Sequence, residues 1–401
     1  MKKKFNIGTT ILIALLCSII TFTATYSVAM VKFKNDTKYE VNEASYITKL
    51  KQVDKLIRSI FVGKIDDDYL SDKIIEGYIN GLNDKYSRYY SIDEMSAYMD
   101  SLNSELIGIG VYVVFDETIG GIYITGLMPD SPALNAGMQI GDVITKVEDI
   151  ELSAETYYEA LAAVPGKEGE IRKIEIKRAP DYDQPIKMEI EIKRVTQNTV
   201  NYQMLDNSIA LIEILQFNTP TAEEFKQTLD KALEDGAKKF IFDVRNNPGG
   251  ALDAIVDVLD RILPDGPIVR IVSSDGSERV INSSNKQVLD APIVVLVNKN
   301  TASAAELFSS ALRDYKIATI IGETTYGKGT MQSIRYLSDG SGVSISTNMY
   351  NPPYGDNYEG IGVIPHIEVK LTQEQLSNYY KLTVEEDPQI QAAIKELQYK
   401  D

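Results

Sequence analysis

Residues 293–306 read Ile293-Val294-Val295-Leu296-Val297-Asn298-Lys299-Asn300-Thr301-Ala302-Ser303-Ala304-Ala305-Glu306. Five consecutive apolar residues, then a short polar turn and an alanine-rich segment, are typical of a buried strand that leads into a helix. Ser303 falls at this junction, where a scaffold presents a reactive side chain at the edge of a sheet. The stretch therefore predicts a strand-helix unit with a candidate nucleophile at its turn.

Strands and helices alternate on both sides of this junction, from about residue 199 to residue 371. Strands are predicted over 209–214, 239–244, 293–297 and 317–321, and helices over 221–234, 252–263 and 304–315. Such alternation predicts an α/β core with a largely parallel sheet. A short amphipathic helix is predicted at the end of the chain, over 387–399.

The chain before this core has two other patterns. Between about residues 42 and 105, apolar residues recur at three- and four-residue spacing, and Ser91-Ile92-Asp93-Glu94 is typical of a capping box. This part is either a plain helical linker or a two-helix arm that packs on something else. From about 106 to 195, short β runs predominate, with a short helix that Gly137 ends and a second helix over 154–163.

The N-terminus predicts a membrane-targeting segment. Lys2-Lys3-Lys4 precede a run without charge from Phe5 to Val31, which is long enough to span a bilayer as a helix. A cleaved signal peptide is the rival interpretation, because Ser27-Val28-Ala29 offers small residues at a cleavage site. Since the uncharged run exceeds a usual signal core, we favour a single-pass anchor over residues 1–35, and with either interpretation the bulk of the chain is expected outside the cytoplasm.

Composition excludes several classes of site. The 401 residues carry a net charge of −17, which argues against nucleic acid or an anionic membrane surface as the main partner. Cys17 is the one cysteine and lies in the N-terminal apolar run, so the remaining chain has no disulfide or thiolate metal site. His366 is the one histidine, which argues against a zinc enzyme, and we interpret it as structural. No metal or cofactor is expected.

A lysine is therefore the alternative base for a serine nucleophile. Lys328 lies between two glycines in Thr325-Tyr326-Gly327-Lys328-Gly329-Thr330-Met331-Gln332. A lysine acts as a base only when its amine is neutral, which requires burial away from water. Taken singly, Ser303 is more typical of a helix cap, and Lys328 and Gln332 are compatible with a solvated loop lysine and a surface residue.

Three separated motifs resemble those of the carboxyl-terminal processing, or tail-specific, proteases. They are Asp243-Val244-Arg245-Asn246-Asn247-Pro248-Gly249-Gly250, Thr301-Ala302-Ser303-Ala304-Ala305-Glu306 and Tyr326-Gly327-Lys328-Gly329-Thr330-Met331-Gln332. Residues 131–144 resemble a PDZ domain of the bacterial, circularly permuted kind, and the resemblance extends to Leu82-Asn83-Asp84-Lys85-Tyr86-Ser87. Agreement of three motifs and a domain order is far more specific than one glycine-rich string.

The resemblance implies a serine endopeptidase with a ββα, crotonase/ClpP-like α/β protease core and an inserted β-rich PDZ domain. It implies that Ser303 is the nucleophile, that Lys328 is the general base and that Gln332 orients the lysine. The N–H groups of Ala304 and Gly250 would form the oxyanion hole, with Gly249 a close second. Ile107-Gly108-Ile109-Gly110 would hold the carboxylate of an extended peptide tail.

The domains predicted on this basis are a signal anchor at 1–35, a helical arm at 36–103, the PDZ domain at 104–196, the protease core at 197–385 and a C-terminal helix at 386–401. The resemblance implies protein substrates with apolar C-terminal tails, a homodimer formed through the arm and the C-terminal helix, and a place at the bacterial cell membrane. The alternative function is that of a non-catalytic PDZ scaffold that binds protein C-termini. A third interpretation is an acyl-CoA-type enzyme, but the PDZ domain and the anchor argue against it.

One departure from the family pattern leaves regulation open. Pro165-Gly166 stands where many relatives carry Arg-Gly, and that arginine is implicated in linking the PDZ domain to the active site. Arg172 or Arg178 is a candidate substitute.

Overall fold

The computed structural model describes residues 45–116, 120–180, 184–284 and 289–399, together with Thr21, Thr23 and residues 25–27. These divide into two compact units, residues 1–73 and 74–401. The predicted anchor over 1–35 lies almost entirely outside the described residues. Among the residues that are described, no helix is both long and apolar enough to cross a bilayer.

In the first unit, α2 (Tyr46–Ile60) is an amphipathic helix without a buried residue. Its apolar residues Leu50, Val53 and Leu56 are all exposed. Arg58 forms ion pairs with Asp54, one turn earlier, and with Asp67 at the start of α3 (Asp67–Asn80). The helical pattern predicted for this part is confirmed.

The α/β core is a six-stranded sheet in the order β10-β11-β12-β15-β16-β19, parallel except for β10. Its strands are β10 (Val200–Leu205), β11 (Ile209–Ile214), β12 (Lys239–Asp243), β15 (Ile293–Val297), β16 (Ala318–Gly322) and β19 (Ile367–Glu368). A 3-10 turn, η1 (Asp206–Ser208), joins the first two. The largely parallel sheet predicted from the alternation is confirmed.

Helices cover both faces of this sheet because its strands are apolar on both sides. One core cluster joins the sheet to α7 (Thr221–Glu234), α8 (Leu252–Asp260) and α9 (Ala304–Asp314). A second cluster packs alternate strand residues against α11 (Pro388–Gln398). The helix predicted over 252–263 is shorter, because the chain turns after Asp260. Two short helical turns, α10 (Gln373–Ser377) and η2 (Tyr379–Lys381), precede α11.

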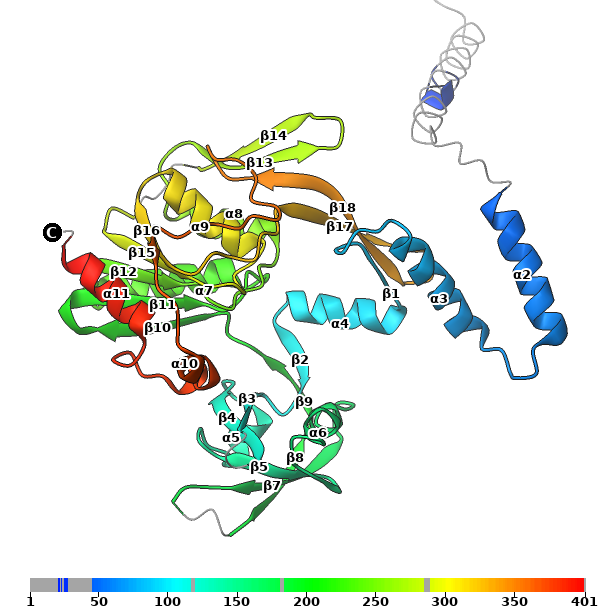
Figure 1. The fold of residues 1–401 in the computed structure, drawn as a ribbon, viewed down its shortest axis with the longest axis horizontal. Coiled ribbons are helices and arrows are strands. Elements are labelled where there is room, and N and C mark those ends of the chain that lie inside the picture. Colours follow the sequence, from blue (N-terminus) through cyan, green and yellow to red (C-terminus); the bar gives the residue numbers. More distant parts are fainter. Residues whose placement is uncertain are drawn as a thin grey trace, which may run out of the picture. The chain divides into compact units, whose positions relative to one another are not determined.

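A second, antiparallel sheet was not predicted, and it carries part of the candidate site. Its order is β1-β18-β13-β14, with β17 also paired to β18. The strands are β1 (Arg88–Tyr90), β13 (Pro267–Ser273), β14 (Glu278–Asn282), β17 (Thr330–Tyr336) and β18 (Gly342–Asn351). Figure 1 shows β18 running from β13 to β1. The region predicted as a helical arm therefore contains a strand, which precedes α4 (Ile92–Leu102).

The capping box predicted at the start of α4 is confirmed. The N–H of Ser91 donates to Glu94 Oε2 at 3.0 Å, and the N–H of Glu94 donates to Ser91 Oγ at 3.4 Å.

The β-rich unit has its own sheet and its own core. The sheet order is β3-β4-β5-β7-β8, with β6 paired to β5. The elements are β3 (Val111–Asp116), β4 (Gly121–Leu127), α5 (Pro132–Asn135), β5 (Val143–Val147), β6 (Ile150–Glu151), α6 (Tyr157–Ala163), β7 (Ile171–Lys177) and β8 (Ile186–Glu191). The entering strand β2 (Glu105–Gly108) and the leaving strand β9 (Lys193–Thr196) pair with each other, so the unit is joined to the core through one two-stranded ribbon (Figure 1).

Helix α6 begins later than predicted. The N–H of Ser153 donates to Thr156 Oγ1 at 2.9 Å, and Thr156 Oγ1 donates to the carbonyl of Glu151 at 2.6 Å. These side-chain bonds hold residues 151–156 in a turn, and they compete with the helix there.

Candidate active site

Ser303 lies on a strained turn between β15 and α9. Its φ of +58° is in the left-handed region that residues other than glycine rarely adopt. The turn is fixed because Thr301 Oγ1 donates to the carbonyl of Val244 at 2.8 Å, and the N–H of Ala302 donates to that of Asn247 at 2.9 Å. Ser303 is thereby held beside the loop that follows β12.

The hydroxyl of Ser303 is buried and points to a tyrosine. Ser303 occupies the N-cap position of α9, and the residue is 9% exposed. Its Oγ lies 2.7 Å from the Oη of Tyr350, a buried residue near the end of β18. Tyr350 Oη also donates to the carbonyl of Lys328 at 3.3 Å.

The glycine loop lies directly against the serine turn. A side chain at Gly249, where φ is +100°, would place its Cβ 2.7 Å from that of Ser303, so only glycine fits there. The N–H of Gly249 already donates to Asn247 Oδ1 at 2.8 Å. For the N–H groups of Gly250 and Ala304, no hydrogen-bond partner is found among the described residues.

Lys328 is half-buried, and burial lowers the pKa of its amine, although the carboxylates of Glu359, Asp84 and Glu306 act in the opposite direction. Its Nζ lies 4.8 Å from the ring centroid of Tyr86. Gln332, which is on β17, donates through Nε2 to Ser346 Oγ at 3.2 Å and to the carbonyl of Thr330 at 3.3 Å. Within the described part of the chain, no hydrogen bond joins the side chains of Ser303, Lys328 and Gln332.

One carboxylate connects the serine turn to the lysine loop. Glu306 is fully buried on the first turn of α9. Its Oε2 accepts the N–H groups of Ser303 and Lys328, each at 2.8 Å, and its Oε1 accepts the N–H of Gly327 at 2.7 Å and the hydroxyl of Thr325 at 2.5 Å. Since both loops bind the same side chain, Glu306 fixes the separation of the two backbones. In the sequence, Glu306 is the last residue of the motif that contains Ser303, and it stands at capping-box spacing from that serine.

The predicted catalytic residues and oxyanion donors line one cavity of about 400 Å³. It contains Ser303, Lys328, Gln332, Gly249, Gly250, Ala304 and Tyr350. Apolar side chains form much of the remaining wall, among them Leu102, Leu252, Ile255, Leu307, Met331 and Ile334. The cavity therefore combines a candidate nucleophile, the half-buried Lys328 and backbone N–H donors with space for apolar groups.

A loop from the N-terminal side covers the lysine, although the sequence did not predict this role. Asp84 accepts the N–H groups of Tyr86 and Ser87, and the N–H of Ser346 on β18 donates to Ser87 Oγ at 3.1 Å. The docked loop places Tyr86 next to Lys328, and Tyr86 Oη donates to Glu359 at 3.3 Å.

The four predicted carboxylate-binding residues lie at the entry to the β-rich unit. Ile107 and Gly108 belong to the β2–β9 ribbon, and Ile109 is buried in the unit's core. Gly110, with φ of +74°, leads into β3, where a Cβ would lie 2.4 Å from that of Ser131. Among the described strands, β4 alone pairs with β3, which leaves the other edge of β3 open; the ring of Phe115 on β3 lies 5.1 Å from that of Tyr157 on α6.

Two arginines, Arg172 and Arg178, were proposed to take the role of the arginine that many relatives carry at the position of Pro165. Both form their hydrogen bonds within the β-rich unit. Arg172 donates to the carbonyl of Pro165 at 2.8 Å, and Arg178 pairs with Asp142 at 2.6 Å. Within the described part of the chain, neither arginine forms a hydrogen bond or ion pair with the α/β core. Instead, Lys381 of η2 pairs with Asp116 at the end of β3, at 2.7 Å.

His366 lies at the edge of the sheet and not in the cavity. Its Nδ1 accepts the N–H of Ile320 at 2.9 Å, and its own N–H donates to the carbonyl of Ile320 at 2.8 Å. This arrangement agrees with the structural role expected for it.

Comparisons with known families match three parts of the chain. Residues 208–369 match peptidase family S41, residues 123–178 match a PDZ domain, and residues 15–101 match the N-terminal domain of the activating protease CtpB.

Individual relatives agree with these matches. The chain is 32% identical over 383 residues to a probable CtpA-like serine protease of Staphylococcus haemolyticus, covering 93% of this chain and 75% of the relative. It is 32% identical over 362 residues to the carboxy-terminal processing protease CtpA of Bacillus subtilis, covering 88% and 76%.

Two solved structures have a similar fold. A photosystem II D1 C-terminal processing protease has 25% identity and a TM-score of 0.50, with 82% of this chain and 88% of that one covered. A putative S41 protease from Bacteroides fragilis has 16% identity and a TM-score of 0.63, covering 86% and 94%, and it supports the fold alone.

Proposed function

The chain belongs to the CtpA-like carboxy-terminal processing serine proteases of peptidase family S41, and on this premise we propose that it cleaves extracytoplasmic proteins near their C-termini with a Ser303–Lys328 dyad. The observation that carries the proposal is the single cavity that holds Ser303, Lys328 and Gln332, with a lysine whose pKa is lowered by burial.

In the proposed reaction, the neutral amine of Lys328 removes the proton of Ser303 as Oγ attacks the substrate carbonyl. The amide of Gln332 orients the amine without the charge of a carboxylate, which would favour the protonated form. The N–H groups of Gly250 and Ala304 receive the oxyanion, since both are free of other partners in the described structure. The N–H of Gly249 is less suited because Asn247 already binds it.

The PDZ domain supplies the proposed specificity. An extended tail can pair with the open edge of β3 as an added strand, with its carboxylate near Gly110 and its side chains toward α6.

The residues over 1–35 would anchor the protease to the bacterial cell membrane. The exposed apolar face of α2 is suited to pairing with a second copy, so a homodimer belongs to the proposal.

Tail dependence tests the function directly. Two reporter proteins that differ only in their last three residues, either apolar or aspartates, are incubated with the purified full-length chain. We expect the apolar-tailed reporter to be cut at least about ten-fold faster, the difference that about 1.4 kcal/mol of tail binding provides. Mass spectrometry locates the cut. Equal rates for both tails would contradict capture by the PDZ domain, and binding without any cleavage would favour the non-catalytic scaffold.

The pH profile of kcat/KM tests the role of Lys328. Because only the neutral amine is a base and burial lowers its pKa, activity should rise with pH through a limb below the ordinary lysine pKa of about 10.4. The nearby carboxylate of Glu359 raises the pKa of Lys328, so Glu359→Gln should move this limb to lower pH. A limb that stays in place, or moves to higher pH, would argue against Lys328 as the titrating base.

A further inference from the structure

Tyr350 contacts both halves of the proposed dyad. It is 5% exposed, and its Oη lies 2.7 Å from Ser303 Oγ and 3.3 Å from the carbonyl oxygen of Lys328. Burial raises the pKa of the Tyr350 phenol above its ordinary value, so the hydroxyl keeps its one proton. The sequence motifs gave no indication of this residue.

Counting protons leaves two arrangements for these groups. The carbonyl of Lys328 can only accept a hydrogen bond. If Tyr350 donates to that carbonyl, then the short contact with Ser303 requires the serine to donate to Tyr350. If Tyr350 donates to Ser303 instead, the serine proton is free for another acceptor, such as a neutral lysine amine.

The position of the lysine favours the first arrangement in the free enzyme. The amine of Lys328 lies over the ring of Tyr86, at 4.8 Å from its centroid. Among the described residues, no hydrogen bond links that amine to Ser303. When Tyr350 donates to the carbonyl of Lys328, the serine proton has Tyr350 Oη as its acceptor, at 2.7 Å.

The position of Tyr350 is coupled to the lysine loop through its backbone. The N–H of Tyr350 donates to the carbonyl of Gly329 at 3.0 Å, directly after Lys328. Asn357 Nδ2 binds both carbonyls of this pair, that of Gly329 at 3.1 Å and that of Tyr350 at 3.0 Å. A movement that brings Lys328 toward Ser303 thus acts on Tyr350 as well.

We propose that Tyr350 is a positioning residue that holds the hydroxyl of Ser303 in a resting hydrogen bond, which must be exchanged for the bond to Lys328 before attack. This inference rests on the proposed function, because it takes Ser303 as the nucleophile. It predicts that the free enzyme is restrained at the nucleophile itself, in addition to any control by the PDZ domain.

The test is the rate at which a small fluorophosphonate, without any tail, labels the full-length protein. Tyr350→Phe keeps the ring and removes the hydroxyl, so Ser303 loses its resting acceptor. Labelling should become about three- to ten-fold faster, the range of one net hydrogen bond, while the melting temperature changes little. Tyr350→Met removes the same hydroxyl with different packing, and it should also accelerate labelling. Tyr315→Phe is the matched control, because its hydroxyl donates to the carbonyl of Pro267 outside the cavity, and we expect no change.

The outcomes separate this inference from the function on which it rests. Ser303→Ala should abolish labelling in both the native and the Tyr350→Phe backgrounds. If the native protein is labelled and both Tyr350 variants are labelled at the same rate or more slowly, the resting bond is refuted while the protease function stands. If Ser303 is not labelled in any variant and apolar-tailed reporters are not cut, the dyad is refuted and this inference with it.

Discussion

Replacing Lys328 by arginine is expected to lower kcat/KM for an apolar-tailed reporter by at least about three orders of magnitude, and Ser303→Ala should do the same. Arginine keeps the charge and a long stem, but its guanidinium does not lose a proton in proteins, so it cannot accept one from Ser303. Lys328→Met removes the amine and keeps an apolar stem of similar volume. All three losses should appear in kcat, because the affected step is the attack on the carbonyl.

The matched control is the same substitution at a neighbouring lysine. Lys85 is exposed, and its Nζ lies 4.5 Å from the ring centroid of the same Tyr86 that covers Lys328. Lys85→Arg should therefore leave kcat/KM within about two-fold, since a surface substitution away from the cavity changes little. Reporter cleavage by Lys328→Arg at more than about a tenth of the native rate, in protein with native circular dichroism, would eliminate Lys328 as the base.

The elements around Ser303 could be predicted because their signals are local. The apolar run 293–297 is fully buried as β15, and the helix after it begins at Ala304 as expected. Helix α7 has the predicted bounds, Thr221–Glu234, because its apolar residues recur at helical spacing. In each case a few consecutive residues contain enough information to specify the element.

The antiparallel sheet was missed mainly because its central strand, β18, lacks such a signal. Strand β18 reads Gly342-Val343-Ser344-Ile345-Ser346-Thr347-Asn348-Met349-Tyr350-Asn351 and is largely polar, and its stability comes from pairing with three other strands. Strand propensity depends on such neighbours more than on the segment itself. The sequence therefore indicates that Lys328 and Gln332 belong to one motif. It does not indicate that β17 and β18 form a hairpin, which brings Tyr350 next to Ser303.

The chemical environment of the site could be predicted less well than the strands and helices that surround it. The motifs identify the serine, the lysine and the glycine loop, but the pKa of Lys328 depends on burial and on residues distant in the chain, including Asp84 and Glu359. Tyr86 reaches the lysine only because its loop docks on β18. Glu306 belongs to the motif that contains Ser303, but its bonds to the lysine loop follow from tertiary packing alone.

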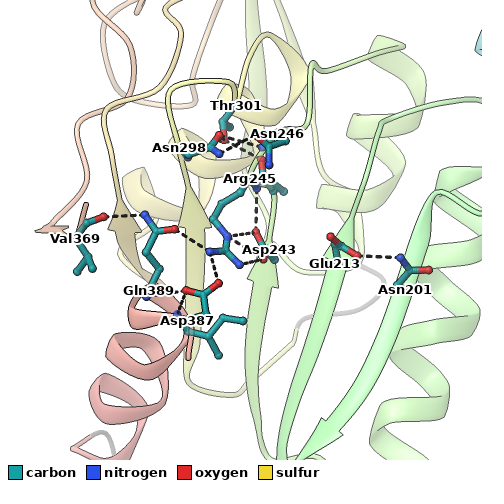
Figure 2. A network of polar contacts seen from close by, with 12 residues as sticks. Asn201, Glu213, Asp243, Arg245, Asn246, Asn298, Thr301, Val369, Asp387 and Gln389 are labelled. Atoms are coloured by element: carbon teal, nitrogen blue, oxygen red, sulfur yellow. Dashed lines mark hydrogen bonds and ion pairs between the residues drawn. The ribbon is translucent and has the colours of Figure 1, made fainter. Parts of the chain in front are cut away.

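A buried ion-pair network supports the sheet below the glycine loop (Figure 2). Arg245, whose side chain is 3% exposed, pairs with Asp243 at 2.6 Å and with Asp387 at 2.7 Å, and it also donates to Gln389 Oε1 at 2.8 Å. Gln389 Nε2 in turn donates to the carbonyl of Val369 at 2.7 Å. The network therefore joins the end of β12, just before the glycine loop, to the N-terminus of α11.

Arg245→Met is expected to reduce the free energy of unfolding by about 3–5 kcal/mol, the range for removing one partner of a buried pair. The side-chain volume is largely kept, but the carboxylates of Asp243 and Asp387 remain buried without their cation. Arg245→Lys should lose less, because an ammonium keeps the charge but lacks the planar fork that binds several acceptors at once. Arg194→Met is the control, since its pairs with Asp100 and Glu105 are partly exposed and screened by solvent, so its loss should be much smaller than that of Arg245→Met. Urea unfolding followed by circular dichroism measures all three variants. If Arg245→Met and Arg194→Met reduce the free energy of unfolding equally, the buried network is no more stabilising than an exposed ion pair. A much larger reduction for Arg245→Met would show that ion pairs, as well as the apolar face of α11, hold this helix to the catalytic sheet.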